Sequence, residues 1–318
     1  MTPTFNISKE IQDKFYPFTQ TRNAVDMRIG ILTIREKWER LDFKEEITTL
    51  RLPGIVNPFE TKELNKLMDI VLLNDWAIRQ DFEMITKGRL SQPIAASNKT
   101  INPENIFIEE GAKVECSVIN ASTGPVYIGR NAEVMEGCKI RGPFSLGENS
   151  VLKMGAKVYG ATTLGPYSMG GGEIKNSVIF GHSNKAHDGY LGDSVIGEWC
   201  NLGAGTTNSN VKNTAGDVKL WDNATQTFQS AGIKCGLMMG DYSRAAINTS
   251  FNTGTVVGVC CNVFAEGFPP KYIPDFTWGK ERYILENAFK DIDNWKQLKG
   301  KKISEAEIEI LKTLYNNK

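Results

Sequence analysis

Histidine is scarce in this chain, which has only His182 and His187 among its 318 residues. None of its six cysteines forms a CxxC pair, so a zinc site is not expected. The chain also lacks an excess of either charge, because 37 basic residues balance 37 acidic ones. A balanced charge gives no electrostatic reason to expect nucleic acid or an anionic membrane as a partner. No run of about 18 apolar residues is present, so no membrane span is expected.

The N-terminal 18 residues are polar and lack the apolar segment of a secretory signal peptide. Reduced thiols that are mostly buried are therefore the simplest interpretation of the cysteines. The pair Cys260–Cys261 is expected in the core and not in redox chemistry. These features together predict a cytoplasmic protein.

An aliphatic residue recurs at every sixth position, and this repeat is the main signal in the sequence. The register consists of Ile128, Val134, Ile140, Leu146, Leu152, Val158 and Leu164. A period of six fits neither an α-helix nor a simple alternating strand. It fits a short strand and a turn wound into parallel coils, each burying its apolar face against the next. The same pattern surrounds Ile108, Ile196 and Val257. A β-sandwich with irregular strands is the alternative structure.

The register breaks twice, and both breaks are of functional interest. The first, between residues 170 and 191, contains both histidines. Its triple glycine, Gly170 to Gly172, is weak evidence for a phosphate loop, because no helix start with lysine and threonine follows. We expect it to relieve crowding at a corner of the coil. The second, 211–237, is rich in turn formers and predicts a loop that leaves the coil. Insertions in repeat proteins often gather on the binding face.

The two ends of the chain do not follow the repeat. Residues 28–41 are consistent with a buried strand followed by a helix start, and residues 60–86 have the apolar spacing of helices. The chain becomes helical again after residue 275, and Ser304 with Glu307 forms a capping-box signature. The predicted fold class is therefore mainly β. Its predicted domains are a short α/β or helical N-terminal domain (1–100), a β-helix (101–275) and a helical extension (276–318).

The segment SNKAHDGYLGDSVIGEWCNLGAGTTNSN (183–210) resembles a known active-site stretch. It is similar to the acetyltransferase half of the bifunctional bacterial enzyme that acetylates glucosamine 1-phosphate and then uridylylates it. More widely, the chain resembles sugar nucleotidyltransferase proteins of that superfamily, of the Bacteroidetes type. Residues 16–38, 81–94 and 235–276 carry this wider resemblance. It implies a left-handed parallel β-helix, an exception to the usual right-handed crossover. It also implies a homotrimer with acetyl-CoA lying along a cleft between neighbouring coils.

The resemblance also assigns roles to individual residues. His187 matches the general base that removes a proton from the sugar amine, a step that suits imidazole near neutral pH. Asn201 is placed with it in the catalytic group. The predicted substrate-binding residues are Lys153, Lys175, Tyr190 and Asn210. Ala204 lies where the backbone runs beside the pantetheine arm of the cofactor. The chain departs from the family at Val211, where the family has tyrosine, and lacks one residue before His187.

Three functions are compatible with the sequence. The first is an acyltransferase that uses acetyl-CoA to acetylate the amine of an amino-sugar phosphate or a nucleotide-linked amino sugar. The second is a sugar-phosphate nucleotidyltransferase, which would need Mg²⁺ and a glycine-rich loop for the nucleotide phosphates. No such loop is present, and PFTQTR (17–22) keeps only a trace of it, so this activity is expected to be lost. The third is a trimeric scaffold without catalysis.

Overall fold

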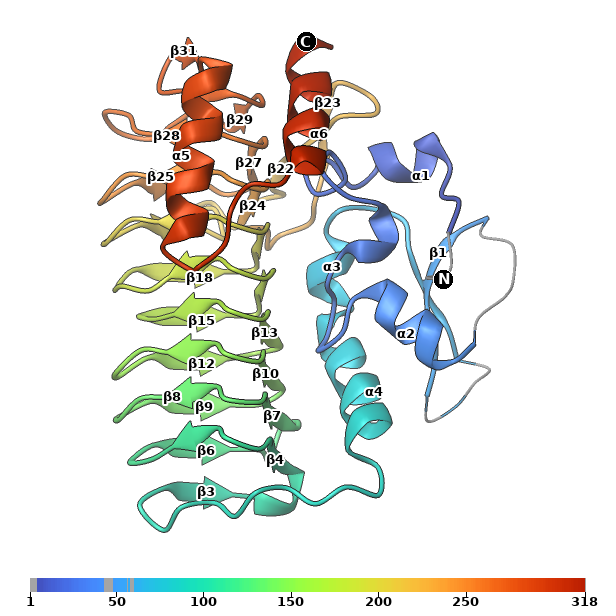
Figure 1. Cartoon of the computed structure of the whole chain (residues 1–318), viewed down its shortest axis with the longest axis vertical. Helices are drawn as coiled ribbons and strands as arrows, with labels where there is room; N and C mark the ends of the chain where they lie inside the picture. The colour runs from blue at the N-terminus through green and yellow to red at the C-terminus, as the bar shows by residue number, and fades with distance from the viewer. Residues whose placement is uncertain (1–4, 43–47, 56, 58–59, 318) are drawn as a thin grey trace.

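A stack of parallel coils forms the body of the molecule, with the N-terminal helices along one side of the stack and the C-terminal helices at its upper end (Figure 1). This computed structural model describes residues 5–42, 48–55, 57 and 60–317. The first four residues of the polar N-terminus therefore lie outside the described residues. The chain is mainly β and forms a parallel β-helix, as the six-residue repeat predicts. The left-handed sense of the coil stays a prediction.

Each coil contributes one strand to each of three sheets, so strands three apart in the chain are hydrogen-bonded neighbours. Sheet 1 comprises β4 (Ile106–Ile108), β7 (Val126–Ile128), β10 (Phe144–Leu146), β13 (Thr162–Leu164), β16 (Val178–Ile179), β19 (Val195–Ile196), β24 (Leu237–Met239), β27 (Thr255–Val257) and β29 (Tyr272–Ile273). Sheet 2 comprises β5 (Lys113–Val114), β8 (Glu133–Val134), β11 (Val151–Leu152), β14 (Met169–Gly170), β17 (Asn184–Lys185), β20 (Asn201–Leu202), β25 (Arg244–Ala245), β28 (Asn262–Val263), β30 (Thr277–Trp278) and β31 (Glu281–Arg282). Sheet 3 comprises β3 (Lys99–Ile101), β6 (Val118–Asn120), β9 (Lys139–Arg141), β12 (Lys157–Tyr159), β15 (Glu173–Lys175) and β18 (Tyr190–Gly192), followed by the separate pair β21 (Thr207–Asn208) and β26 (Ser250–Phe251).

The aliphatic repeat points into the coils, as the six-residue period predicts. All seven residues from Ile128 to Leu164 are buried in one hydrophobic cluster that runs through the stack. Leu146 pairs with Ile128 on one side and with Leu164 on the other, so 18 positions make one regular coil. Each such buried side chain contributes roughly 1.5–3 kcal/mol relative to an exposed one. The interior therefore stabilises the stack along its whole length.

The structure differs from the sequence-based prediction in two places, one in the N-terminal region and one in the inserted loop. The strand expected within residues 28–41 is a single bridge between Arg28 and Thr33, which leads into α2 (Ile34–Arg40). The second break in the register does leave the coil, but it contains an antiparallel hairpin, β22 (Lys219–Asp222) and β23 (Thr227–Ser230). A high content of turn-forming residues predicts a loop, but it does not reveal that two short strands within the loop form a hairpin.

The N-terminal region covers the outer face of sheet 1. Its other elements are α1 (Lys9–Asp13), η1 (Ala24–Asp26), β1 (Leu50–Leu52), β2 (Lys62–Leu64), α3 (Asp69–Leu72) and α4 (Asn74–Thr86). Phe18 packs against Phe180 with ring centroids 5.3 Å apart, in a cluster that also holds the outward-facing Val195 and Met238. Side chains that would otherwise be exposed on sheet 1 thus gain a second hydrophobic core.

The C-terminal helices pack against one corner of the upper coils (Figure 1). They are α5 (Leu285–Gln297) and α6 (Glu305–Asn316). At the other end of the stack, a short 3₁₀ turn, η2 (Pro103–Asn105), connects β3 to β4. The predicted capping box is confirmed, because Ser304 and Glu307 exchange side-chain and backbone hydrogen bonds at the start of α6. Trp199 and Cys260 lie at the covered corner, so both are packing residues, and the expected core position of Cys260 is confirmed.

Candidate functional site

His187 lies exposed at the corner between β17 of sheet 2 and β18 of sheet 3. In most coils this corner takes six positions from one inward-facing residue to the next, as from Leu152 to Val158. The coil directly below His187 takes only four, from Gly170 to Ile174. The wall of the β-helix is therefore two residues shorter below His187, and the exposed His187 lies in the corner directly above this shortened corner.

The triple glycine makes the shortened corner possible. A Cβ on Gly171 would lie 2.4 Å from the carbonyl oxygen of Ala186, and one on Gly172 would lie 2.9 Å from the carbonyl oxygen of His187. Gly172 also has a φ of +67°, a conformation that only glycine adopts at little cost. The expected role of the glycines, relief of crowding at a corner, is confirmed. They let the His187 corner rest directly on the one below.

Lys185 occupies a position where the repeat places an aliphatic residue. It is 2% exposed, and in sheet 2 it pairs with Gly170 of the coil below. Its ammonium group donates to the carbonyl oxygens of Gly171, at 3.1 Å, and of His187, at 2.5 Å. Burial lowers the pKa of Lys185 to about 8, although nearby Asp188 acts in the opposite direction. This residue was missed from the sequence, because the shortened corner hides the register that marks the position as inward-facing.

Tyr190 and Asn210 come together at the far side of sheet 3. The side-chain amide of Asn210 donates to the Tyr190 hydroxyl at 3.1 Å and to a carboxylate oxygen of Asp193. Asn176 donates to the other oxygen of Asp193 at 2.6 Å. Burial, followed by the charge of Asp193, raises the pKa of Tyr190 above its usual value. The Tyr190 hydroxyl therefore stays protonated and can serve a ligand as donor or acceptor.

Lys175 lies on the strand beside Tyr190 and close to a second tyrosine. Its ammonium nitrogen is 5.7 Å from the centre of the Tyr159 ring. The Tyr159 hydroxyl donates to Glu173 at 2.5 Å, and this hydrogen bond is the main reason that the pKa of Tyr159 is raised. Since Glu173 pairs with Tyr190 across the strands, these four side chains share the outer face of sheet 3. These four side chains offer two hydroxyls, one carboxylate and one ammonium group to a polar ligand.

The remaining predicted residues lie around the His187 corner. Ala204 lies at the same corner one coil above, where Gly205 donates its backbone N–H to the carbonyl oxygen of Asp188 at 3.0 Å. Asn201 is on sheet 2, with its amide oxygen 3.5 Å from the side-chain nitrogen of Asn184. Lys153 is at the corner two coils below His187. Lys153 therefore lies below the His187 corner, Asn201 lies on sheet 2 one coil above it, and Tyr190 and Asn210 lie toward the far side of sheet 3.

Residues 17–22, which resemble the end of a nucleotide-binding loop, pack against the β-helix. Arg22, within residues 17–22, forms ion pairs with Asp241 and, at 3.2 Å, with Glu198 of the β-helix. Thr21 donates to the same Asp241 carboxylate at 2.5 Å. The guanidinium is 11% exposed and also lies over the Phe180 ring. The arginine that could contact nucleotide phosphates is therefore engaged with carboxylates of this chain.

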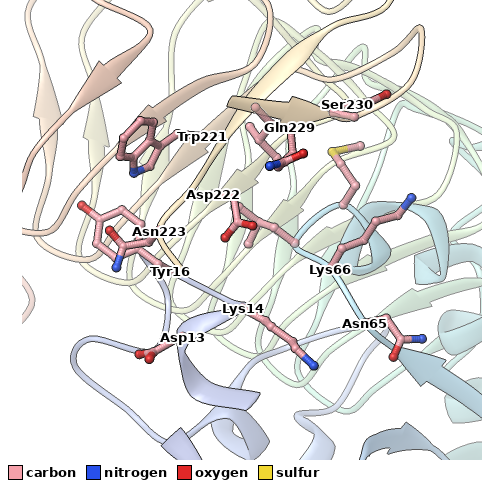
Figure 2. A pocket seen from close by; sticks show the side chains of 14 residues that line it. Asp13, Lys14, Tyr16, Asn65, Lys66, Trp221, Asp222, Asn223, Gln229 and Ser230 are labelled. Carbon is pink, nitrogen blue, oxygen red and sulfur yellow. The ribbon is translucent and has the colours of Figure 1, made fainter. Parts of the chain in front are cut away.

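A separate cavity of about 140 Å³ lies between the N-terminal region and the inserted hairpin (Figure 2). Polar side chains from three segments surround it, among them Lys14, Lys66 and Asp222. None of the predicted site residues lines it.

Within the described residues no group of three or more His, Cys, Asp or Glu side chains could hold a metal ion. No helix in that part of the chain has the length and apolar character needed to cross a membrane.

Comparison with known proteins gives one family-model match and several partial matches to curated proteins. Residues 8–53 match the family model described as sugar nucleotidyl transferase. A segment of 89 residues is 36% identical to the bifunctional protein GlmU of Methanocaldococcus jannaschii, covering 28% of this chain and 21% of that protein. The bifunctional sugar-1-phosphate nucleotidylyltransferase/acetyltransferase of Sulfurisphaera tokodaii is 34% identical over 92 residues, covering 29% and 23%. The matched part thus spans only about a fifth of the length of these relatives.

Among solved structures, the Arabidopsis UDP-N-acetylglucosamine acyltransferase aligns with 71% of this chain and 90% of its own, at 16% identity and a TM-score of 0.28. The repeat, the parallel coils and the sequence matches define the class of hexapeptide-repeat β-helix proteins. Within the matched segments this chain is similar to GlmU and to a bifunctional nucleotidylyltransferase/acetyltransferase. The Bacteroidetes type stays a prediction.

Proposed function

We propose that this protein is an acyltransferase that uses acetyl-CoA to acetylate the amine of an amino-sugar phosphate or a nucleotide-linked amino sugar. The observation that carries the proposal is the position of His187, exposed above a corner shortened by two residues and beside the polar face of sheet 3. The GlmU-like matches support transfer to a sugar substrate. The cytoplasm is the expected compartment.

His187 serves as the general base in this proposal. Its imidazole accepts a proton from the attacking amine while the amine nitrogen forms a bond to the thioester carbon. The carbon–sulfur bond then breaks, and the imidazolium returns its proton to the leaving thiolate. The products are an N-acetyl sugar and free CoA, so no acyl-enzyme forms and no cysteine is required. Among the described residues, only Cys116 of the six cysteines is exposed.

The polar residues hold the acceptor sugar. Tyr190 and Asn210 face the ring hydroxyls, and Lys175 and Lys153 supply positive charge for a phosphate. Lysine acts here as a point charge, without the bidentate fork of arginine. Asn201, beside the same corner, orients the reacting groups from the sheet 2 side.

The corner above His187 suits the extended pantetheine arm of acetyl-CoA. Gly203, Ala204 and Gly205 follow one another there, and a Cβ on Gly203 would lie 2.6 Å from the backbone nitrogen of Ile247. Small residues let a chain lie close to the backbone and use its N–H and C=O groups. We further propose that a homotrimer completes the cleft, as the resemblance implies.

Nucleotidyl transfer is the less favoured function. Its matched region, residues 8–53, contributes Arg22 to a buried ion pair instead of to a phosphate loop. A Mg²⁺-dependent transfer from UTP or dTTP is therefore expected to be absent.

Release of free thiol from acetyl-CoA, measured with a panel of amino-sugar phosphates and nucleotide amino sugars, tests the proposal. We expect thiol release to depend on one acceptor class and to yield one N-acetyl product by mass spectrometry. Parallel assays of pyrophosphate release with UTP and dTTP should show none. Pyrophosphate release without thiol release would favour the nucleotidyltransferase instead.

A further inference from the structure

Lys185 stands out because it breaks the rule that the interior of the β-helix is aliphatic. The inward column of sheet 2 contains Val114, Val134, Leu152, Gly170, Lys185, Leu202, Ala245 and Val263. Lys185 is the only charged residue in that column. Burial of a charge is costly unless hydrogen bonds compensate it. The two carbonyl oxygens that accept from its ammonium group provide that compensation.

These two acceptors belong to two different corners. One is Gly171, in the shortened corner, and the other is His187, in the corner that rests on it. The lysine side chain therefore ties the two corners together from inside the coil. Because the His187 carbonyl is held inward, the backbone at this residue has little freedom to rotate, and its imidazole stays on the outer side.

The neighbouring glycines explain why a lysine fits here. Its partner in the coil below is Gly170, which has no side chain at the equivalent inward position, and a Cβ there would already lie 2.4 Å from Leu164. An aliphatic residue at position 185 could fill the same space, but it would leave both carbonyl oxygens without the ammonium donor. The lysine thus supplies hydrogen bonds to two backbone carbonyl oxygens, which packing of the interior alone does not require.

We propose that Lys185 is a positioning residue for His187, which holds the imidazole over the shortened corner through the His187 carbonyl oxygen. Only the expected effect of Lys185 on catalysis rests on the proposed function. The ordering of His187 itself is measurable without any substrate. A misplacement of about 1 Å at a reacting group can reduce a rate by about 10²-fold.

The test compares Lys185→Met with Leu202→Met, the matched substitution in the same inward column one coil above. Since the chain has only two histidines, a ¹H–¹³C NMR spectrum of the imidazoles contains one set of signals for each. In Lys185→Met we expect the His187 signals to broaden or split while the His182 signals and the melting temperature change little. We also expect kcat to fall by about 10-fold or more, with little change in KM for acetyl-CoA. Leu202→Met should leave both histidines sharp.

Two results would overturn the inference. One is a folded Lys185→Met variant with unchanged His187 signals, and the other is equal disturbance of both histidines, which indicates a purely structural lysine. If Lys185→Met does not fold, Lys185→Gln replaces it in the test, because glutamine retains an N–H donor without charge. In this variant the NMR signals of His187 alone should broaden relative to wild type. A wild-type protein without acyl transfer would contradict the proposed function, but the NMR comparison would still decide whether Lys185 orders His187.

Discussion

The imidazole of His182 stacks on the indole of Trp199, with ring centroids 4.2 Å apart and planes only 2° from parallel. Tyr167 stacks on the opposite side at 5.0 Å, and Lys299 donates to the backbone carbonyl oxygen of His182 at 2.9 Å. The histidine is therefore a packing residue at the corner where the segment after α5 attaches.

The His182 stack predicts a specific loss of stability in acid. Burial, with help from nearby lysines, lowers the pKa of His182 to about 3. Between about pH 6.5 and that value, the unfolded chain binds a proton that the folded chain does not bind. The stability contribution is thus present above pH 6.5 and is lost as the pH falls. His182→Phe keeps the stacking, so between pH 7 and 5 its melting temperature should fall by roughly 2 °C less than that of wild type. Equal losses would contradict this explanation.

The ion pair of Arg22 with Asp241 predicts a large effect of breaking it. Removal of one partner leaves a buried charge without compensation, which typically costs about 3–5 kcal/mol. Arg22→Ala should therefore lower the free energy of unfolding, measured by urea denaturation, by that amount. The control is Lys14→Ala, whose exposed ion pair with Glu10 should contribute about 1 kcal/mol or less. Similar small losses in both variants would show that the N-terminal region docks without this pair.

Gly172 and Gly155 form a matched pair for testing the shortened corner. Both have positive φ, +67° and +70°, but a Cβ on Gly155 would have nothing within 4 Å. Gly155→Ala should cost about 1–2 kcal/mol from backbone strain alone. Gly172→Ala should destabilise the protein further and lower kcat, because the new methyl group would displace the His187 corner. Circular-dichroism melts and acetyl-transfer rates measure the two effects, and equal behaviour of the variants would argue against close contact of the corners.

The repeat could be read from the sequence because each coil follows the same rule, and one interior position predicts the next. This reasoning gave the strands, the core residues from Ile128 to Leu164 and both breaks. It failed where the rule changes: Lys185 looked like part of a loop because the corner before it is two residues shorter. Docking of Arg22 on Asp241 joins residues 219 positions apart, a contact that no local pattern indicates.

The Asn210 contacts predict a separation of stability from substrate binding. Asn210→Asp and Asn176→Asp each place a second carboxylate beside Asp193, so both should lower the melting temperature. Only Asn210 also contacts Tyr190. Asn210→Asp should therefore raise KM for the acceptor sugar several-fold, while Asn176→Asp leaves that KM near the wild-type value. An equal rise in both variants would place Tyr190 outside the acceptor site.

The most direct test of the central claim is the kcat for acetyl transfer in His187→Ala relative to wild type, measured once an acceptor is known. Glu136→Ala is the control, because Glu136 is an exposed residue at the same corner three coils below. We expect kcat to fall by about 10²-fold or more in His187→Ala, as for loss of a general base, and to stay unchanged in Glu136→Ala. A His187→Ala variant that is folded and retains the wild-type kcat would contradict the account.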